Sequence, residues 1–323
     1  MRALFKHLLI AMIGAIAVET SAFAQDYPNR TVRILVGYPP GSAPDLAART
    51  IGQSLSQTFG QPFVAESKAG AGGTLATELA ARSPADGYTL LLGETGQLEI
   101  APYLFKGLPY DTLRDFAPIS TFYSTPLIFV SNPTTQIKTI KDLVREAKAN
   151  PGKLNFGSSG IGSIHHIIFE AFNAAAGVKI THIPFKGSTQ TIPALLSGEV
   201  HVIPGSLSVV SAQVRAGTVN ALGVTSIDRY PFAPDVPPIA EEFKGFDFSS
   251  ELGLLAPAGL APEILAKLSR AMKVAIDAPG LREQYKNLGV VFAWSTPEAY
   301  REKIRQNLKK YEQVIKAANI QAN

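Results

Sequence analysis

The chain alternates short apolar runs with longer stretches whose apolar residues recur every three or four positions. Short β-branched and apolar runs favour buried strands, whereas the wider spacing is typical of amphipathic helices. The sequence predicts strands at residues 31–37, 63–66, 88–93, 127–131, 154–157, 179–182, 201–204 and 219–225. It predicts helices between them at residues 46–59, 75–82, 140–149, 163–175, 190–196 and 209–215. This alternation indicates βα units around mostly parallel sheets, and therefore an α/β fold.

The C-terminal part of the chain follows a different pattern. A proline-rich stretch at residues 231–238 and a strand-like run at 246–256 precede two amphipathic segments at 262–276 and 298–318. The second segment opens with Ser295-Thr296-Pro297-Glu298, which fits a helix cap. Two helices are therefore predicted to end the chain.

The N-terminus carries the pattern of a secretory signal. Arg2 and Lys6 precede an apolar run at residues 8–18, and Ala22-Phe23-Ala24 supplies the small residues of a cleavage site. A membrane helix or a buried core helix would be the alternative, but the run is shorter than the ~20 residues that span a bilayer. We expect residues 1–24 to be removed and the mature protein to be soluble in a bacterial periplasm.

Composition narrows the function further. The 323 residues include no Cys and five His, so disulfides, thiolate metal sites and cysteine nucleophiles are excluded. The formal charge of +4 is too small for a nucleic-acid-binding protein, and loss of Arg2, Lys6 and Glu19 with the signal reduces it to +3. The length suggests two domains or one large one. We expect no cofactor and no metal.

Three predicted strands end in loops of Gly, Ser and Pro that run directly into helices, at residues 37–42, 69–73 and 157–163. In open α/β sheets such loops lie at the carboxyl ends of the strands, where ligands bind. Glycine lets backbone N–H groups approach a ligand, and a helix N-terminus adds a partial positive charge. The loops therefore predict an anion site without Arg or Lys. Asp45 fits a capping role in the first turn of its helix at least as well as a ligand contact.

Enzyme motifs give weaker matches. The chain has no GxGxxG, no GxxxxGK[ST] and no GxSxG sequence. Ser158 and Ser159 lie near His165 and His166, which leaves an exported serine hydrolase as an alternative. Adjacent His residues on one helix diverge, so His165 and His166 cannot share a metal. We expect no catalytic residues, and we expect the His side chains to serve as hydrogen-bonding groups.

Nine short motifs, taken together, resemble a known family. They are Tyr27-Pro28, Tyr38-Pro39-Pro40-Gly41 with Asp45, Gly70-Ala71-Gly72-Gly73, Asp86-Gly87-Tyr88-Thr89-Leu90-Leu91, Tyr110-Asp111 with Asp115-Phe116, Asn150-Pro151-Gly152-Lys153-Leu154, Ser158-Ser159-Gly160-Ile161-Gly162-Ser163 with His166, Pro184-Phe185-Lys186-Gly187, and Pro257-Ala258-Gly259. Their order and spacing resemble those of Bug-type extracytoplasmic solute receptors, the substrate-binding proteins of tripartite tricarboxylate transporters.

The resemblance implies a two-domain periplasmic binding protein, similar to type II receptors, with a ligand cleft between the domains. It places residues 25–124 and 250–323 in domain I and residues 125–249 in domain II, with crossings near 123–127 and 245–253. It also implies that backbone N–H groups hold a ligand carboxylate and that a two-subunit membrane permease receives the solute. A sensor kinase in place of the permease is an open alternative. We expect a monomer.

Carried over by position, the binding residues fall in the three loops and around them. They are Tyr38, Gly41, Ser42, Asp45, Gly70, Ala71, Gly72, Gly73, Ser158, Ser159, Gly160, Gly162, Ser163, His166 and Phe185.

The sequence departs from the family pattern at several positions. Ser42 replaces a second Gly, Phe185 replaces a Tyr, His201 replaces a common Asp, and Glu251 stands where the family has Trp. Glu94 directly follows a predicted strand end. If Glu94 and Glu251 both face the cleft, the ligand would carry a carboxylate plus a cationic or hydrogen-donating group. An amino acid or a pyridine carboxylate would fit better than a tricarboxylate. Alternatively, either Glu points to solvent or pairs with Lys186 or another cation.

Overall fold

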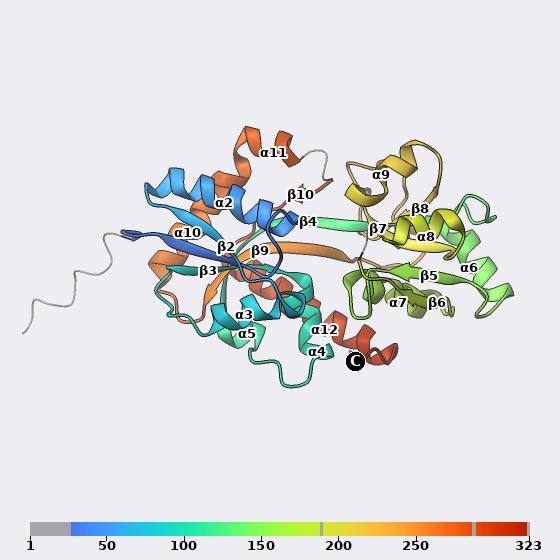
Figure 1. Cartoon of the computed structure of the whole chain (residues 1–323), viewed down its shortest axis with the longest axis horizontal. Helices are drawn as coiled ribbons and strands as arrows, with labels where there is room; N and C mark the ends of the chain where they lie inside the picture. The colour runs from blue at the N-terminus through green and yellow to red at the C-terminus, as the bar shows by residue number, and fades with distance from the viewer. Residues whose placement is uncertain (1–26, 188–189, 286–288, 322–323) are drawn as a thin grey trace, which may run out of the picture.

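The computed structural model describes residues 27–187, 190–285 and 289–321, and the predicted signal at residues 1–24 lies outside this part. The described chain forms two lobes side by side, joined by long strands (Figure 1). Within the described residues, no helix combines the length and the apolar character that crossing a membrane requires.

The first lobe is built on a mixed sheet in the order β2-β1-β3-β9-β4. Its strands are β1 (Val32–Val36), β2 (Phe63–Ser67), β3 (Thr89–Glu94), β9 (Ser249–Pro257) and the first part of β4 (Phe116–Ser131). Strand β1 is parallel to β2 and β3, whereas β9 is antiparallel to β3 and β4. Helices α2 (Ala43–Phe59) and α10 (Pro262–Asp277) pack on one face, and α3 (Thr74–Ala81) and α12 (Pro297–Ala317) pack on the other.

The second lobe repeats this layering. Its strands are the end of β4, β5 (Asn155–Ser158), β6 (Thr181–Pro184), β7 (Val202–Ser206) and β8 (Asn220–Val224). Helices α6 (Ile140–Ala149) and α7 (Ile164–Ala176) cover one face, and α8 (Thr191–Ser197) and α9 (Leu207–Arg215) cover the other. Neighbouring residues of β4 serve opposite faces, as a strand requires: Phe129 packs with α7 and Ile128 with α8. The expected α/β architecture is confirmed. The expectation of mostly parallel sheets was wrong, because β4 and β9 run antiparallel to the strands that they pair with.

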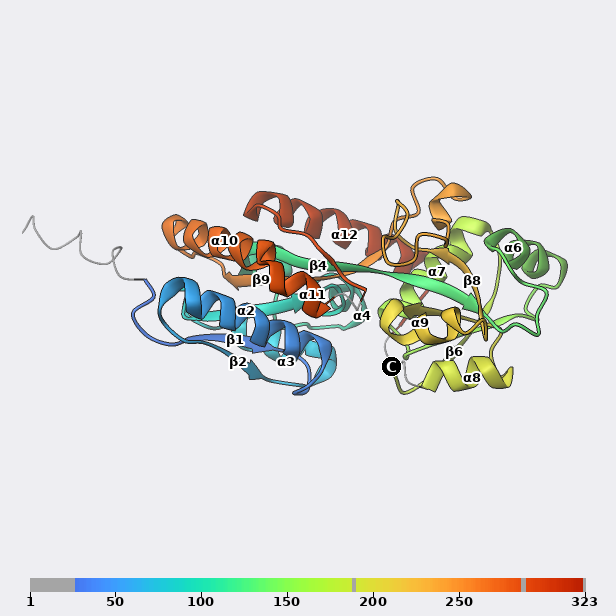
Figure 2. The same cartoon turned by 90° about the horizontal axis from the view of Figure 1, so that it is seen from above.

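Two strands connect the lobes. Strand β4 pairs with β9 as far as Pro126 and with β7 from Leu127 (Figure 2). The sequence predicted only residues 127–131 of this strand. The first part lacks apolar alternation because Ser120 and Thr121 are buried polar residues, and Ser120 accepts a hydrogen bond from the Ser295 N–H at 3.2 Å.

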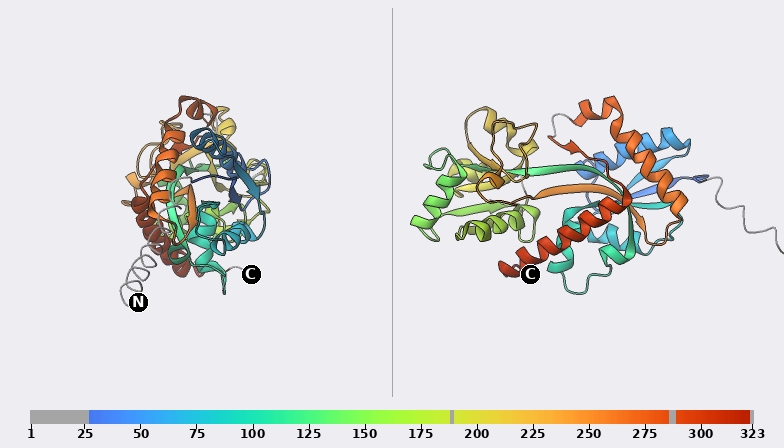
Figure 3. Two further views of the ribbon diagram at one scale, coloured as in Figure 1. Left: turned by 90° about the vertical axis from the view of Figure 1, so that its left-hand side faces the viewer. Right: turned by 180° about the vertical axis from the view of Figure 1, so that it is seen from behind.

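Helix α12 also belongs to both lobes (Figure 3). Tyr300 and Ile304 near its start pack in the core of the first lobe, whereas Tyr311 and Ile315 pack with Phe169 of the second. The chain after β3 makes a similar contact through the π-helical turn η2 (Gly96–Ile100) and helix α4 (Ala101–Leu104). The lobes therefore share apolar contacts beyond the two strands.

Short elements complete the fold. They are η1 (Ala71–Gly73), α5 (Thr112–Asp115), η4 (Ile239–Glu241), α11 (Pro279–Tyr285) and β10 (Val291–Phe292).

Candidate functional site

Two adjoining cavities lie between the lobes, with volumes of about 360 and 190 Å³. They share Glu94, Ile164, His165 and Ser250, and we refer to both together as the cleft. All three loops singled out in the sequence contribute to its lining. The larger cavity is lined by Tyr38 and Gly72 from the first lobe and by Ser159, Gly162 and Ser163 from the second.

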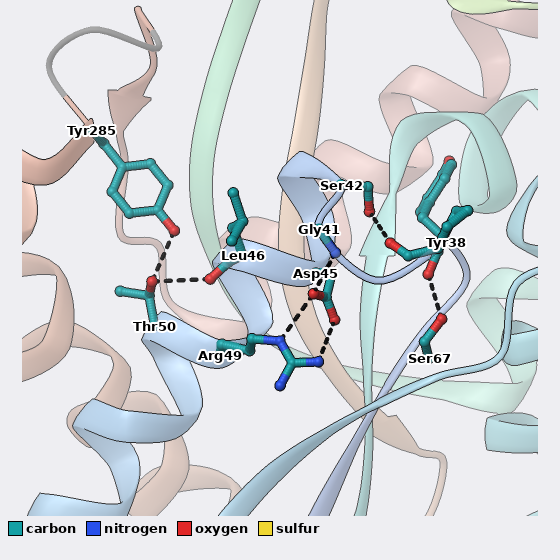
Figure 4. A network of polar contacts seen from close by, with 10 residues as sticks. Tyr38, Gly41, Ser42, Asp45, Leu46, Arg49, Thr50, Ser67 and Tyr285 are labelled. Atoms are coloured by element: carbon teal, nitrogen blue, oxygen red, sulfur yellow. Dashed lines mark hydrogen bonds and ion pairs between the residues drawn. The ribbon is translucent and has the colours of Figure 1, made fainter.

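The first loop follows β1 and leads into α2 (Figure 4). Tyr38 lines the cleft, while its carbonyl oxygen accepts a hydrogen bond from Ser67 Oγ at 2.6 Å. The Asp45 carboxylate accepts hydrogen bonds from the Gly41 N–H at 2.9 Å and from Arg49 Nε at 2.9 Å. Arg49 and the Gly41 N–H lower the pKa of Asp45 despite its burial. Asp45 therefore closes its own loop. This is a structural role, but it differs from the expected cap, because Asp45 accepts the Gly41 N–H before the helix rather than an N–H of the first turn.

Gly41 and Ser42 also serve the loop rather than line the cleft. The Ser42 hydroxyl donates to the Pro39 carbonyl oxygen at 2.7 Å, and the next two residues, Ala43 and Pro44, line the smaller cavity.

In the second loop only Gly72 lines the cleft. Gly70, Ala71 and Gly73 shape the turn, and the Gly73 N–H donates to the Gly70 carbonyl oxygen at 2.9 Å. Close packing explains part of the glycine content. A Cβ added at Gly37 would lie 2.4 Å from the Gly73 Cα, so the first two loops touch through their backbones.

The third loop joins β5 to α7. Ser159, Ile161, Gly162 and Ser163 line the cleft, and Ser163 caps α7 by accepting the His166 N–H at 3.3 Å. The helix N-terminus thereby faces the cleft. Ser158 and Gly160 lie behind this lining.

The adjacent histidines diverge as predicted, but His165, not His166, lines the cleft. The His165 Nδ1 lies 2.8 Å from Ser159 Oγ. His166 turns into the second lobe, where its Nδ1 accepts the Gly162 N–H at 3.1 Å and its ring stacks on His182 with centroids 3.7 Å apart. Burial lowers the pKa of His165 to about 4, so this ring is neutral at pH 7 and adds no positive charge.

Glu94 ends β3 and lines both cavities. Its Oε1 accepts a hydrogen bond from Ser250 Oγ at 3.0 Å. Burial raises the pKa of Glu94, while hydrogen bonds from Tyr38 and Ser250 act in the opposite direction. Within the described residues no Lys or Arg lines either cavity, and no cation pairs with Glu94.

Glu251 does not share the cleft with Glu94. Because side chains alternate along β9, Ser250 faces the cleft and Glu251 faces α12. Glu251 is 5% exposed, forms an ion pair with Lys303, and lines a separate cavity of about 350 Å³ behind the connecting strands. The pairing of Glu251 with a cation was the alternative that the sequence left open.

Phe185 and His201 also lie outside the cleft lining. Phe185 follows β6, and a Cβ added at Gly157 would lie 3.1 Å from its ring, so it supports β5. His201 precedes β7, and its Nδ1 lies 2.8 Å from Asn155 Oδ1 at the start of β5. That is the amino end of the strands, opposite to the cleft.

The structure adds residues that the sequence reasoning missed. Ser206 and Ser208 line the smaller cavity where β7 passes into α9. The carboxyl-end rule used for the other loops could have found them. Thr125 and Leu127 line it from the crossing strand, and Ile100, Ala101, Leu104 and Phe105 line the larger cavity. These positions carry no distinguishing motif.

Comparison with known proteins assigns the family. Residues 47–320 match the tripartite tricarboxylate transporter family receptor. Protein BugT of Bordetella pertussis is 32% identical over 314 residues, which cover 95% of this chain and 96% of BugT. The solved structure of R. palustris Rpa4515 with adipate is 28% identical, with a TM-score of 0.78, and the match covers 92% of this chain and 100% of that one. MatC (Rpa3494) from Rhodopseudomonas palustris with bound malate is 29% identical, with a TM-score of 0.73, and the match covers 90% and 100%. This chain therefore belongs to the tripartite tricarboxylate transporter receptor family, as its resemblance to Bug-type receptors predicted, and it is a solute-binding receptor of a tripartite transporter.

Proposed function

We propose that the cleft binds a small solute through one carboxylate, held by the backbone N–H groups of the three loops. The convergence of these loops on a cleft whose lining, among the described residues, holds no Lys or Arg is the observation that carries the proposal. A carboxylate at the N-terminus of α7 meets unpaired N–H groups and a favourable dipole. The adipate and malate in the structures of the two relatives support this class of ligand.

We further propose that the solute carries a hydrogen-donating or cationic group that contacts Glu94. Glu94 is the acidic side chain among the described residues of the cleft lining. A charge-assisted hydrogen bond to it would contribute about 1.5–3 kcal/mol. A tricarboxylate would instead place further negative charge beside Glu94. An amino acid or a pyridine carboxylate meets both requirements.

A thermal-shift panel of the mature chain tests both proposals. Adipate, malate, citrate, aspartate, glutamate and nicotinate would each be titrated, because a ligand that binds only the native state stabilises it by RT ln(1 + [L]/Kd). We expect Glu94→Gln to weaken an amine-bearing ligand by about 10- to 100-fold. Glu251→Gln, which changes a carboxyl outside the cleft, is the matched control. A preference for citrate that Glu94→Gln leaves unchanged would refute the role of Glu94.

The family and the N-terminal signal pattern support a proposal on where the protein acts. We propose that the chain is cleaved after Ala24, acts in the periplasm as a monomer and passes its solute to a two-subunit membrane permease. We also propose that residues 25–124 with 250–323, and residues 125–249, move as domains. The change of strand partner between Pro126 and Leu127 supports this division. Peptide sequencing of the exported protein and its mass in solution test the first proposal.

One contact favours the hydrolase alternative, namely Ser159 Oγ at 2.8 Å from His165 Nδ1. Two features weaken it. Burial lowers the pKa of His165 to about 4, which makes the ring a poor base. In the described part of the chain, no carboxylate hydrogen-bonds to this ring to orient it. We therefore propose that the protein acts by binding alone. Ester hydrolysis that disappears in Ser159→Ala would contradict this.

A further inference from the structure

The larger cavity combines a polar lining with an apolar one. Its apolar part, which we call the apolar patch, consists of Ile100, Ala101, Leu104, Phe105, Ile161 and Ile164. Four of these residues lie in one short segment, from Ile100 at the end of η2 to Phe105 just after α4, on the first-lobe side. Of the other two, Ile161 lies within the third loop and Ile164 is the first residue of α7. Apolar surface therefore lies within one cavity next to the proposed carboxylate site.

Two members of the patch are unusually open to solvent. Phe105 is 45% exposed and Ile161 is 47% exposed, whereas most large apolar side chains of the described chain are buried. They come from different lobes. Their segments nevertheless face each other closely, because a Cβ added at Gly162 would lie 2.5 Å from Leu104 Cδ1. A solute bound here would be covered from both sides.

We infer that this receptor selects a carboxylate attached to an apolar body, either a ring or an alkyl chain, that covers Phe105 and Ile161. The inference rests on the carboxylate proposal above and deepens it. Removing apolar surface from water favours binding in proportion to the area covered. Two cavities of about 360 and 190 Å³ leave room for a ring-sized body beside the carboxylate.

Small polar acids fit this cavity less well. In malate and citrate nearly every carbon bears or adjoins a polar group, so little apolar surface would meet the patch. Hydroxyl or carboxyl groups placed against Leu104 and Phe105 would lose water without gaining a partner. The same residues therefore favour one class of acid and disfavour the other.

A graded series of acids tests the inference on the mature chain at pH 7.5. Acetate, butyrate, hexanoate and benzoate would be compared with malate and citrate by calorimetry. We expect affinity to rise about two- to fourfold for each added methylene, and benzoate to exceed acetate by at least tenfold.

Two variants and one control locate the effect. Phe105→Ser and Ile161→Ser should each weaken benzoate about five- to tenfold and change acetate less than twofold. Both side chains are half exposed, so either variant alone supports the test if the other fails to fold. Val274→Ser on α10 is the control, because Val274 is 61% exposed and lies outside the cleft. It should leave the whole series unchanged.

The outcomes distinguish a failure of the carboxylate proposal from a failure of the inference about the apolar patch. Binding of none of the six acids, and of no compound in the thermal-shift panel, would overturn both the carboxylate proposal and this inference. An affinity that does not change with chain length, or that is higher for malate and citrate, would overturn the inference alone. An equal loss of acetate and benzoate in Phe105→Ser and Ile161→Ser would also overturn it.

Discussion

Gly37→Ala tests whether the first two loops form one preassembled wall of the cleft. Gly37 follows β1, and a Cβ added there would lie 2.4 Å from the Gly73 Cα and 2.9 Å from the Gly73 carbonyl oxygen. Ordinary contact begins near 3.4 Å, so the two backbones would have to separate by about 1 Å. Because the obstacle is backbone, no side-chain rotation relieves it.

The cost can be estimated from overpacking. Forcing extra volume into a packed site costs about 1–3 kcal/mol, and the lower entropy of the unfolded Ala chain offsets roughly 0.5 kcal/mol. We expect a net loss of about 2 kcal/mol, which corresponds to a fall in Tm of about 3 °C for a chain of about 300 residues. Tyr38 and Gly72 line the cleft next to this contact, so solute affinity should fall as well.

Thermal unfolding of the mature chain measures the effect. Gly280→Ala on α11 is the control, because nothing lies within 4 Å of a Cβ there. It should be neutral or slightly stabilising. A Tm of Gly37→Ala within 1 °C of the wild-type value would refute the backbone contact between the loops.

Three further predictions concern buried polar groups. His166→Leu removes the acceptor of the Gly162 N–H and should lower the free energy of unfolding in urea by about 1–2 kcal/mol. His166→Asn retains an acceptor and should lower it less. Equal losses in the two variants would contradict the role of the ring as an acceptor. Burial lowers the pKa of His166 and His182 to about 4, from an ordinary 6.5. Between these pH values the unfolded chain therefore binds more protons than the native chain. The free energy of unfolding should therefore fall as the pH is lowered from 6.5 to 4. A double variant, His166→Asn with His182→Gln, should show a shallower fall. An unchanged slope in this variant would contradict the role of the two histidines. Burial raises the pKa of Glu251, and Lys303→Met removes the cation that pairs with its carboxylate. The variant should lose roughly 1–2 kcal/mol of unfolding free energy at pH 8, and the loss should shrink as the pH is lowered, because a protonated carboxyl needs no cation. A loss independent of pH would point to another cause.

Much of the fold follows from local pattern. The predicted strands and helices between residues 31 and 225 overlap the observed ones, because each apolar run is long enough to bury one face of a sheet or helix. The first part of β4 was not predicted because it lacks a continuous apolar run. It is buried yet polar, and Ser120 and Thr121 find hydrogen-bond partners near Ser295 that only the folded chain supplies.

The cleft shows the same division at the level of single residues. Loop composition pointed to the right regions, since Tyr38, Gly72, Ser159, Gly162 and Ser163 all line the larger cavity. It did not identify which neighbour in a pair would face the solute.

In two pairs of neighbouring residues, the orientation of the strand or helix decides which side chain faces the cleft. Ser250 faces the cleft and Glu251 faces Lys303, because β9 alternates its side chains in a register set by its partners β3 and β4. His165 faces the cleft and His166 faces His182, because the rotation of α7 is set by its apolar packing.

The sequence by itself determined the α/β architecture, the family and the three loops, because these depend on periodicity and on glycine-rich turns that are local in the chain. Tertiary structure decided the orientation of Glu251, the choice of His165 and the apolar patch of the cleft. Those features depend on strand register, helix rotation and the meeting of distant segments such as Leu104 and Gly162, and such contacts are set by packing of the whole chain rather than by any local pattern.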